Sequence, residues 1–159
     1  MNKITVLIVD DHAILRMGLA SLLNAKADIE VVGDAANGTL GIKKSLKLRP
    51  DVVIMDLMMP GMNGTETTAQ LIAKDPNSKV LILTTFGTSD GITHALQAGA
   101  LGAIMKNCDF GELVTAIRTV AKGKKYVSPE VERIISKDPP VVPLSPRQEE
   151  ILQSIIRGL

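Results

Sequence analysis

Hydrophobic residues along the chain gather in five short runs, separated by longer segments with helical spacing. The runs cover residues 4–9, 29–35, 51–56, 79–84 and 102–105. Most of them are continuously apolar and rich in β-branched residues, which is typical of strands buried on both faces of a parallel sheet. The pattern therefore predicts five parallel strands that alternate with helices.

Two of the intervening segments carry an apolar stripe. The first stripe consists of Leu15, Leu19, Leu22 and Leu23. The last consists of Phe110, Leu113, Val114, Ile117, Val120 and Ala121. Asp109 stands at the expected N-cap of the last helix, with Glu112 three residues later and Gly123 just past the end. Five strand–helix repeats predict a doubly wound α/β domain over residues 1–124.

The remaining residues divide into a linker and a final helix. Residues 125–143 begin with a short helix, capped by Ser128 and started by Pro129, and end in the proline-rich stretch DPPVVP. Residues 144–159 form a helix with an apolar stripe that nothing downstream covers. We interpret this helix as the start of a second domain that is cut short. A docking surface for a partner is the alternative.

Composition narrows the functional classes. The net charge is +1, which gives no electrostatic argument for a free-standing nucleic-acid binder. A single cysteine excludes an internal disulfide and fits a reducing compartment. The sequence contains no apolar run long enough for a signal peptide or a membrane span. We therefore expect a cytoplasmic protein without a membrane partner.

Three carboxylates follow predicted strands. Asp10 and Asp11 end the first strand, and Asp56 ends the third. The carboxyl ends of parallel strands meet at one sheet edge, where ligand sites form. Like charges at about 4 Å repel by roughly 4 kcal/mol even at an effective dielectric constant near 20, so the cluster requires a cation. Oxygen ligands of this kind suit Mg²⁺, which we predict as the cofactor.

Two further polar residues are expected at the same edge. Thr84 ends the fourth predicted strand, and Lys106 follows the fifth. A hydroxyl and an ammonium group can both bind phosphate oxygens. Together with the carboxylates and a metal ion, they supply the groups needed to transfer a phosphoryl group onto Asp56.

The motifs VDDH (9–12), DLMMPGMNG (56–64), LTTF (83–86) and MK (105–106) together resemble the receiver domain of bacterial two-component response regulators. This resemblance implies a flavodoxin-like, doubly wound, five-stranded parallel sheet. It also implies that Asp56 is the phosphoacceptor and that a sensor histidine kinase or a small phosphodonor supplies the phosphoryl group.

By the same resemblance, Asp10, Asp11 and Asp56 hold Mg²⁺, with the backbone carbonyl of Met58 as a further ligand. Thr84 is then the switch hydroxyl, and Lys106 binds the phosphoryl group.

Residues 144–159, LSPRQEEILQSIIRGL, are similar to the opening helix of the LuxR-type helix-turn-helix domain. Together the two resemblances indicate the NarL/FixJ group of transcriptional regulators. They imply that phosphorylation frees or dimerises a C-terminal DNA-binding domain. Because the recognition helix of such a domain is missing, we do not expect the fragment itself to bind DNA.

Two other functions stay open. A Mg²⁺-dependent phosphohydrolase with an aspartyl-phosphate intermediate is the first, although Asp56-Leu57-Met58 offers no second acid for the leaving group. A receiver whose tail docks a protein instead of DNA is the second. We expect a phosphoacceptor switch, whose enzymatic activity is limited to self-phosphorylation from small donors and self-dephosphorylation.

The sequence also departs from the receiver pattern. Ala103 stands three residues before Lys106, where receivers usually carry Tyr or Phe, so an aromatic rotamer switch cannot operate. Asn107 follows the lysine, where Pro or Asp is more usual. His12 is interpreted as a bystander beside the acid pair, and His94 and Cys108 receive no role.

Overall fold

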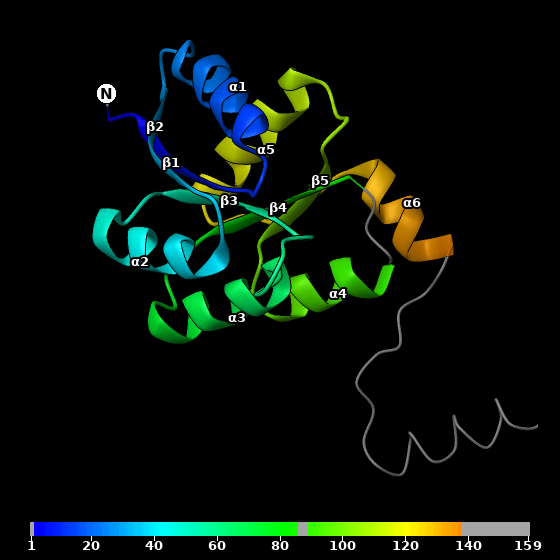
Figure 1. Cartoon of the computed structure of the whole chain (residues 1–159). Helices are drawn as coiled ribbons and strands as arrows, with labels where there is room; N and C mark the ends of the chain where they lie inside the picture. The colour runs from blue at the N-terminus through cyan, green and yellow to red at the C-terminus, as the bar shows by residue number, and fades with distance from the viewer. Residues whose placement is uncertain (1, 86–88, 138–159) are drawn as a thin grey trace, which may run out of the picture.

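A computed structural model describes residues 2–85 and 89–137, so the predictions for residues 138–159 lie outside the described residues. A parallel sheet crosses the molecule in the order β2-β1-β3-β4-β5-β6 (Figure 1). The strands are β1 (Ile4–Val9), β2 (Ile29–Ala35), β3 (Val52–Asp56), β4 (Val80–Thr84), β5 (Gly102–Met105) and β6 (Tyr126–Val127). The parallel, doubly wound fold and its five predicted strands are confirmed.

The predicted strand count was wrong, because the sheet has six strands. The sixth strand, β6, pairs with β5 through Gly102↔Tyr126 and Ala103↔Val127. Gly102 permits this approach, since a Cβ there would lie 2.5 Å from the carbonyl oxygen of Tyr126. Two residues are too few to produce the apolar run by which the other strands were recognised.

Six helices cover the two faces of the sheet within the described residues. They are α1 (Ala13–Asn24), α2 (Gly38–Leu48), α3 (Gly64–Lys74), α4 (Ser89–Gln97), α5 (Phe110–Ala121) and α6 (Pro129–Lys137). Figure 1 shows α1 and α5 on one face and α2, α3 and α4 on the other. Each layer closes its own hydrophobic core: Leu23 and Ile117 belong to the first, and Ile42, Leu71 and Ile92 to the second.

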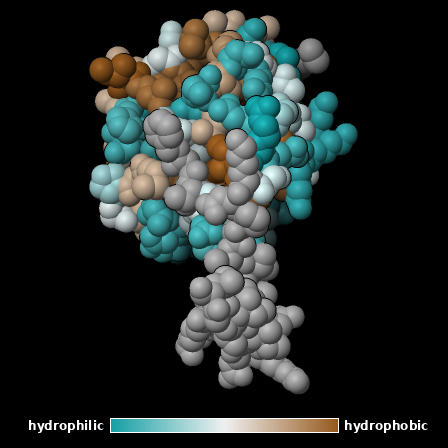
Figure 2. Space-filling model, turned by 90° about the vertical axis from the view of Figure 1, so that its right-hand side faces the viewer, coloured by the Kyte–Doolittle hydropathy of each residue, from teal (hydrophilic) through white to brown (hydrophobic). Residues whose placement is uncertain are grey.

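The two predicted apolar stripes behave differently. The stripe of α5 is largely buried, and the Asp109 carboxylate caps the helix by accepting a hydrogen bond from the Glu112 amide at 2.8 Å. The stripe of α1 is only partly buried, because Leu23 is enclosed while Leu22 is 53% exposed. Seen from the side of β5 and α6, hydrophobic residues gather at the level of the α1–α5 layer (Figure 2).

The last described helix, α6, packs on the domain although it lies in the segment expected as a linker. Ser128 caps it as predicted, since its hydroxyl accepts a hydrogen bond from the Val131 amide at 3.2 Å. Val131 is fully buried, and Ile134 and Ile135 pack against the same core. Residues 126–137 are therefore part of the packed unit.

The helices are short compared with the thickness of a bilayer. The helices α1 and α5 have 12 residues each, whereas a membrane crossing takes about 20 apolar residues. Within residues 2–85 and 89–137, no helix combines the length and the apolar character that a membrane crossing requires.

We predict that Val131→Ala lowers the free energy of unfolding by about 1–3 kcal/mol, because it removes two fully buried methyl groups. Urea denaturation followed by circular dichroism measures this change. Glu132→Ala on the exposed side of the same helix is the matched control. Equal effects of the two variants would show that α6 does not pack as described.

Candidate functional site

The ends of β1 and β3 bring two carboxylates together. The two strands are neighbours, with Val9 opposite Met55. Asp10 directly follows β1, where its amide donates a hydrogen bond to the Ala35 carbonyl at 3.0 Å, and Asp56 is the last residue of β3. Both side chains are almost completely buried. The predicted convergence of acidic groups at this edge is present in the structure.

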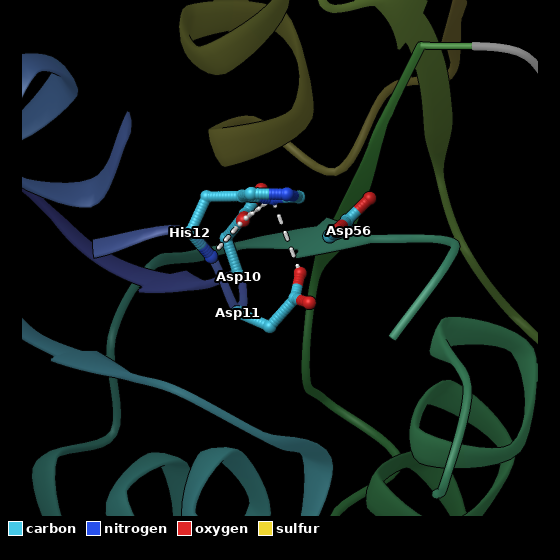
Figure 3. Close-up of side chains that lie close together, drawn as sticks. All are labelled: Asp10, Asp11, His12 and Asp56. Carbon is cyan, nitrogen blue, oxygen red and sulfur yellow. Dashed lines mark hydrogen bonds and ion pairs between the residues drawn. The ribbon is translucent and has the colours of Figure 1, made fainter. Parts of the chain in front are cut away.

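Asp11 and His12 complete a compact cluster with these two residues (Figure 3). Each of Asp10, Asp11, His12 and Asp56 offers one ligand atom, and these atoms all lie within 4.8 Å of one another. The His12 amide donates to Asp10 Oδ1 at 2.7 Å, and its ring Nδ1 lies 3.0 Å from the same oxygen and 3.2 Å from Asp11 Oδ1. The sequence pattern indicated a bystander role for His12, whereas the structure places its ring against both carboxylates.

Lys106 supplies the positive charge that contacts the buried acids. Its Nζ lies 2.7 Å from Asp10 Oδ2 and 3.3 Å from Asp56 Oδ2. The Lys106 amide also donates to the Thr84 carbonyl at 2.7 Å, which fixes the lysine beside the end of β4. One ammonium group against three carboxylates leaves the cluster with an excess of negative charge. A further cation is favourable there.

Thr84 lies where the sequence predicted it, at the end of β4 and next to β5. It is fully buried, and its hydroxyl has no hydrogen-bond partner within the described part of the chain. Buried polar groups are normally paired, so this hydroxyl is available for a further hydrogen bond. The structure thus brings Thr84, Lys106 and Asp56 to one edge.

The loop after Asp56 is fixed at both ends. The Met58 amide approaches Asp56 Oδ1 at 3.4 Å, and the Gly64 amide donates to the Leu57 carbonyl at 2.9 Å. A Cβ on Gly64 would lie 2.2 Å from the Asp56 carbonyl oxygen, so only glycine lets α3 begin this close to β3. The role of the Met58 carbonyl as a metal ligand stays a prediction.

The surroundings of Asp56 disfavour its charged form. Burial, and then the negative charge of Asp10, raise the pKa of Asp56 to about 6, although Lys106 and the Met58 amide pull it down. Holding this carboxylate ionised at neutral pH therefore costs free energy in the folded state. Any cation that binds between the acids recovers part of that cost.

Two residues without an assigned role are not part of the group formed by Asp10, Asp11, His12 and Asp56. His94 is exposed on α4. Cys108 is partly buried, and its burial followed by the charge of Glu112 raises its pKa to about 11. At neutral pH the thiol is protonated and is a poor nucleophile.

We predict that Asp56→Asn stabilises the metal-free protein in EDTA at pH 7 by about 2–3 kcal/mol, the free energy equivalent of the raised pKa. The folded-state pKa lies above the ordinary value of 3.8, so the contribution of this group is fully present below pH 3.8 and is lost as the pH rises through 6. The difference between variant and parent should accordingly grow between pH 4 and pH 7. Denaturation curves at several pH values measure it.

The matched control for this prediction is Asp28→Asn. Arg118 lowers the pKa of that exposed carboxyl, so the pH trend should have the opposite sign. A stability difference for Asp56→Asn that does not change with pH would contradict the burial argument.

Comparison with known proteins agrees with this geometry. The family model for the response regulator receiver domain matches residues 6–118. The transcriptional regulatory protein LiaR of Bacillus subtilis (strain 168) is 41% identical over 128 residues, which cover 80% of this chain and 61% of LiaR. This chain therefore spans about three fifths of the length of that relative.

Solved structures similar to this chain are also response regulators. A LuxR-family two-component response regulator from Aurantimonas sp. SI85-9A1 superimposes with a TM-score of 0.81 at 32% identity, covering 86% of this chain and 97% of that one. A structure of two RcsB dimers bound to two parallel DNAs superimposes with a TM-score of 0.80 at 28% sequence identity. The match covers 99% of this chain and 79% of that one. The chain belongs to the response regulator receiver family, and its relatives are regulators of the LuxR/NarL type.

Proposed function

We propose that this chain is a phosphorylation switch in which Asp56 accepts a phosphoryl group. The observation that carries this proposal is the position of the Lys106 ammonium group, which contacts both Asp10 and Asp56 at the carboxyl edge of the sheet. A buried carboxylate with a cation beside it can bind a phosphoryl group and neutralise its oxygens. Membership of the receiver family supports the same role.

Magnesium fits the residues at this site. Asp10, Asp11 and Asp56 would hold the ion together with the Met58 carbonyl, and all four are hard oxygen donors. The excess negative charge and the raised pKa of Asp56 both favour a bound cation. When bound, magnesium neutralises charge on the phosphoryl oxygens during transfer.

The transfer step follows from the polar groups around Asp56. One carboxylate oxygen of Asp56 attacks phosphorus, and a new O–P bond forms. The P–N bond to a phosphohistidine donor breaks, and the imidazole leaves with the electron pair. Lys106 then pairs with a phosphoryl oxygen, and the Thr84 hydroxyl donates a hydrogen bond to another.

The partner that supplies the phosphoryl group is proposed to be a sensor histidine kinase, and the site of action to be the cytoplasm. In the intact protein, residues 1–124 act as the receiver, residues 125–143 connect it to the output domain, with α6 of this segment packed on the receiver, and residues 144–159 act as the start of a LuxR-type DNA-binding domain. The similarity to RcsB, whose dimers were solved on DNA, supports transcription control and dimer formation as the output.

Acetyl phosphate with Mg²⁺ should label the parent chain, and Asp56→Asn should abolish that labelling, because Asp56 is the acid of the cluster that ends a strand paired with β4 and also contacts Lys106. Intact-protein mass spectrometry detects the added phosphoryl group. EDTA should prevent the reaction, and Asp28→Asn should leave it unchanged. Full magnesium-dependent labelling of Asp56→Asn would refute the assignment.

Lys106→Met should slow labelling by about tenfold or more, because it removes the ammonium group that stabilises the phosphoryl oxygens. Lys122→Met, which removes an exposed ammonium group just after α5, is the control. Initial labelling rates at fixed acetyl phosphate give the comparison. Equal rates for the two variants would remove Lys106 from the proposed site.

Steady release of phosphate from many equivalents of a phosphomonoester would instead support the phosphohydrolase alternative. The described site does not favour it, because exposed Met58 occupies the position where a second acid would act on the leaving group.

A further inference from the structure

The helix α6 fills a junction between α4 and β5 that we name the α6 seat. Three α6 side chains, Val131, Ile134 and Ile135, pack there against the core on that face of the sheet. The Ser128 amide donates to the Ala103 carbonyl at 3.1 Å, which ties the start of α6 to β5. Figure 1 shows α6 beside β5, close to α4.

The α6 seat is continuous with the phosphorylation site. Thr84 lies opposite Met105 in the β4–β5 register. Because side chains alternate along a strand, Thr84 faces the same side as Val80 and Ile82, which belong to the core cluster of Val131. That cluster also contains Ile92 of α4 and Ala103 of β5. The Thr84 side chain therefore lies on the face of the sheet where the α6 core cluster packs.

In this chain no aromatic ring at position 103 can transmit a movement of the Thr84 side chain to the surface. Ala103 is fully buried, and its methyl group cannot change rotamer to follow the threonine. Ile82, two residues before Thr84 on the same face of β4, packs in one core cluster with Ile92 of α4 and Ala103 of β5, so a shift of the threonine would disturb the junction between α4 and β5. Close-packed junctions do not follow such shifts without losing contacts.

We propose that α6 is an autoinhibitory element whose packing in the α6 seat favours the unphosphorylated arrangement of Thr84. Phosphorylation of Asp56 then weakens the packing of α6, and weaker packing of α6 in turn favours phosphorylation, because coupling between two sites is reciprocal. This inference rests on the proposed function, since it takes the phosphoryl group on Asp56 as the input.

Amide hydrogen exchange with Mg²⁺ and beryllofluoride, used as the phosphoryl mimic, tests the coupling. Peptides covering residues 52–64 should exchange more slowly, which reports binding at Asp56. Peptides covering residues 129–137 should exchange about fivefold faster or more, because α6 opens more often. Peptides of α2 serve as the internal control.

A pair of α6 variants tests the reverse direction. Val131→Ala removes packing from the α6 seat and should raise the apparent affinity for beryllofluoride about three- to tenfold, because a larger fraction of molecules is already competent. Glu132→Ala, on the exposed side of α6, should leave the affinity unchanged. If Val131 only stabilised the fold, its replacement by alanine would lower the affinity for beryllofluoride or leave it unchanged. Circular dichroism confirms that both variants are folded before titration.

The outcomes separate this inference from the proposed function. If residues 52–64 gain protection while residues 129–137 exchange at an unchanged or slower rate, the autoinhibitory role of α6 is wrong and the phosphoacceptor assignment stands. An affinity for Val131→Ala equal to that of the parent leads to the same conclusion. If beryllofluoride protects nothing around Asp56, the proposed function fails, and the role of α6 fails with it.

Discussion

Burial of carboxylate side chains at one edge of the sheet is the constraint on which the rest of the structure depends. Asp10 and Asp56 are buried side by side because β1 and β3 are neighbours. Lys106 is the compensating cation, and its own position is fixed by a backbone hydrogen bond to Thr84. Isolated buried charges cost far more free energy than a domain can lose, so these strands and the lysine form one interdependent unit.

Much of the fold could be predicted, because its signals are local. Continuous apolar runs identified five strands to within a residue of their observed bounds. The acidic residues could be placed at one edge because strands in a parallel sheet all end on the same side. Asp10, Asp56 and Lys106 were found for this reason, and the structure brings them into contact.

The features that were missed arise from contacts between distant residues. The strand β6 has only two residues, and it is defined by its pairing with β5 and not by its own pattern. The packing of α6 depends on a junction built by α4 and β5, which no local spacing reveals. His12 was interpreted as a bystander beside the acid pair, yet its amide and ring both contact Asp10. Sequence spacing predicts elements well, but it does not show which surfaces they share.

The contact between Gly64 and the end of β3 has a consequence for the loop that joins them. Since the start of α3 lies against the Asp56 carbonyl and the Gly64 amide donates to the Leu57 carbonyl, residues 57–63 form a loop whose two ends are close together. Gly61, with a φ of 76°, is the position in this span whose backbone can rotate at least cost. A side chain at position 61 would therefore strain the backbone of this span even though the space around it is open.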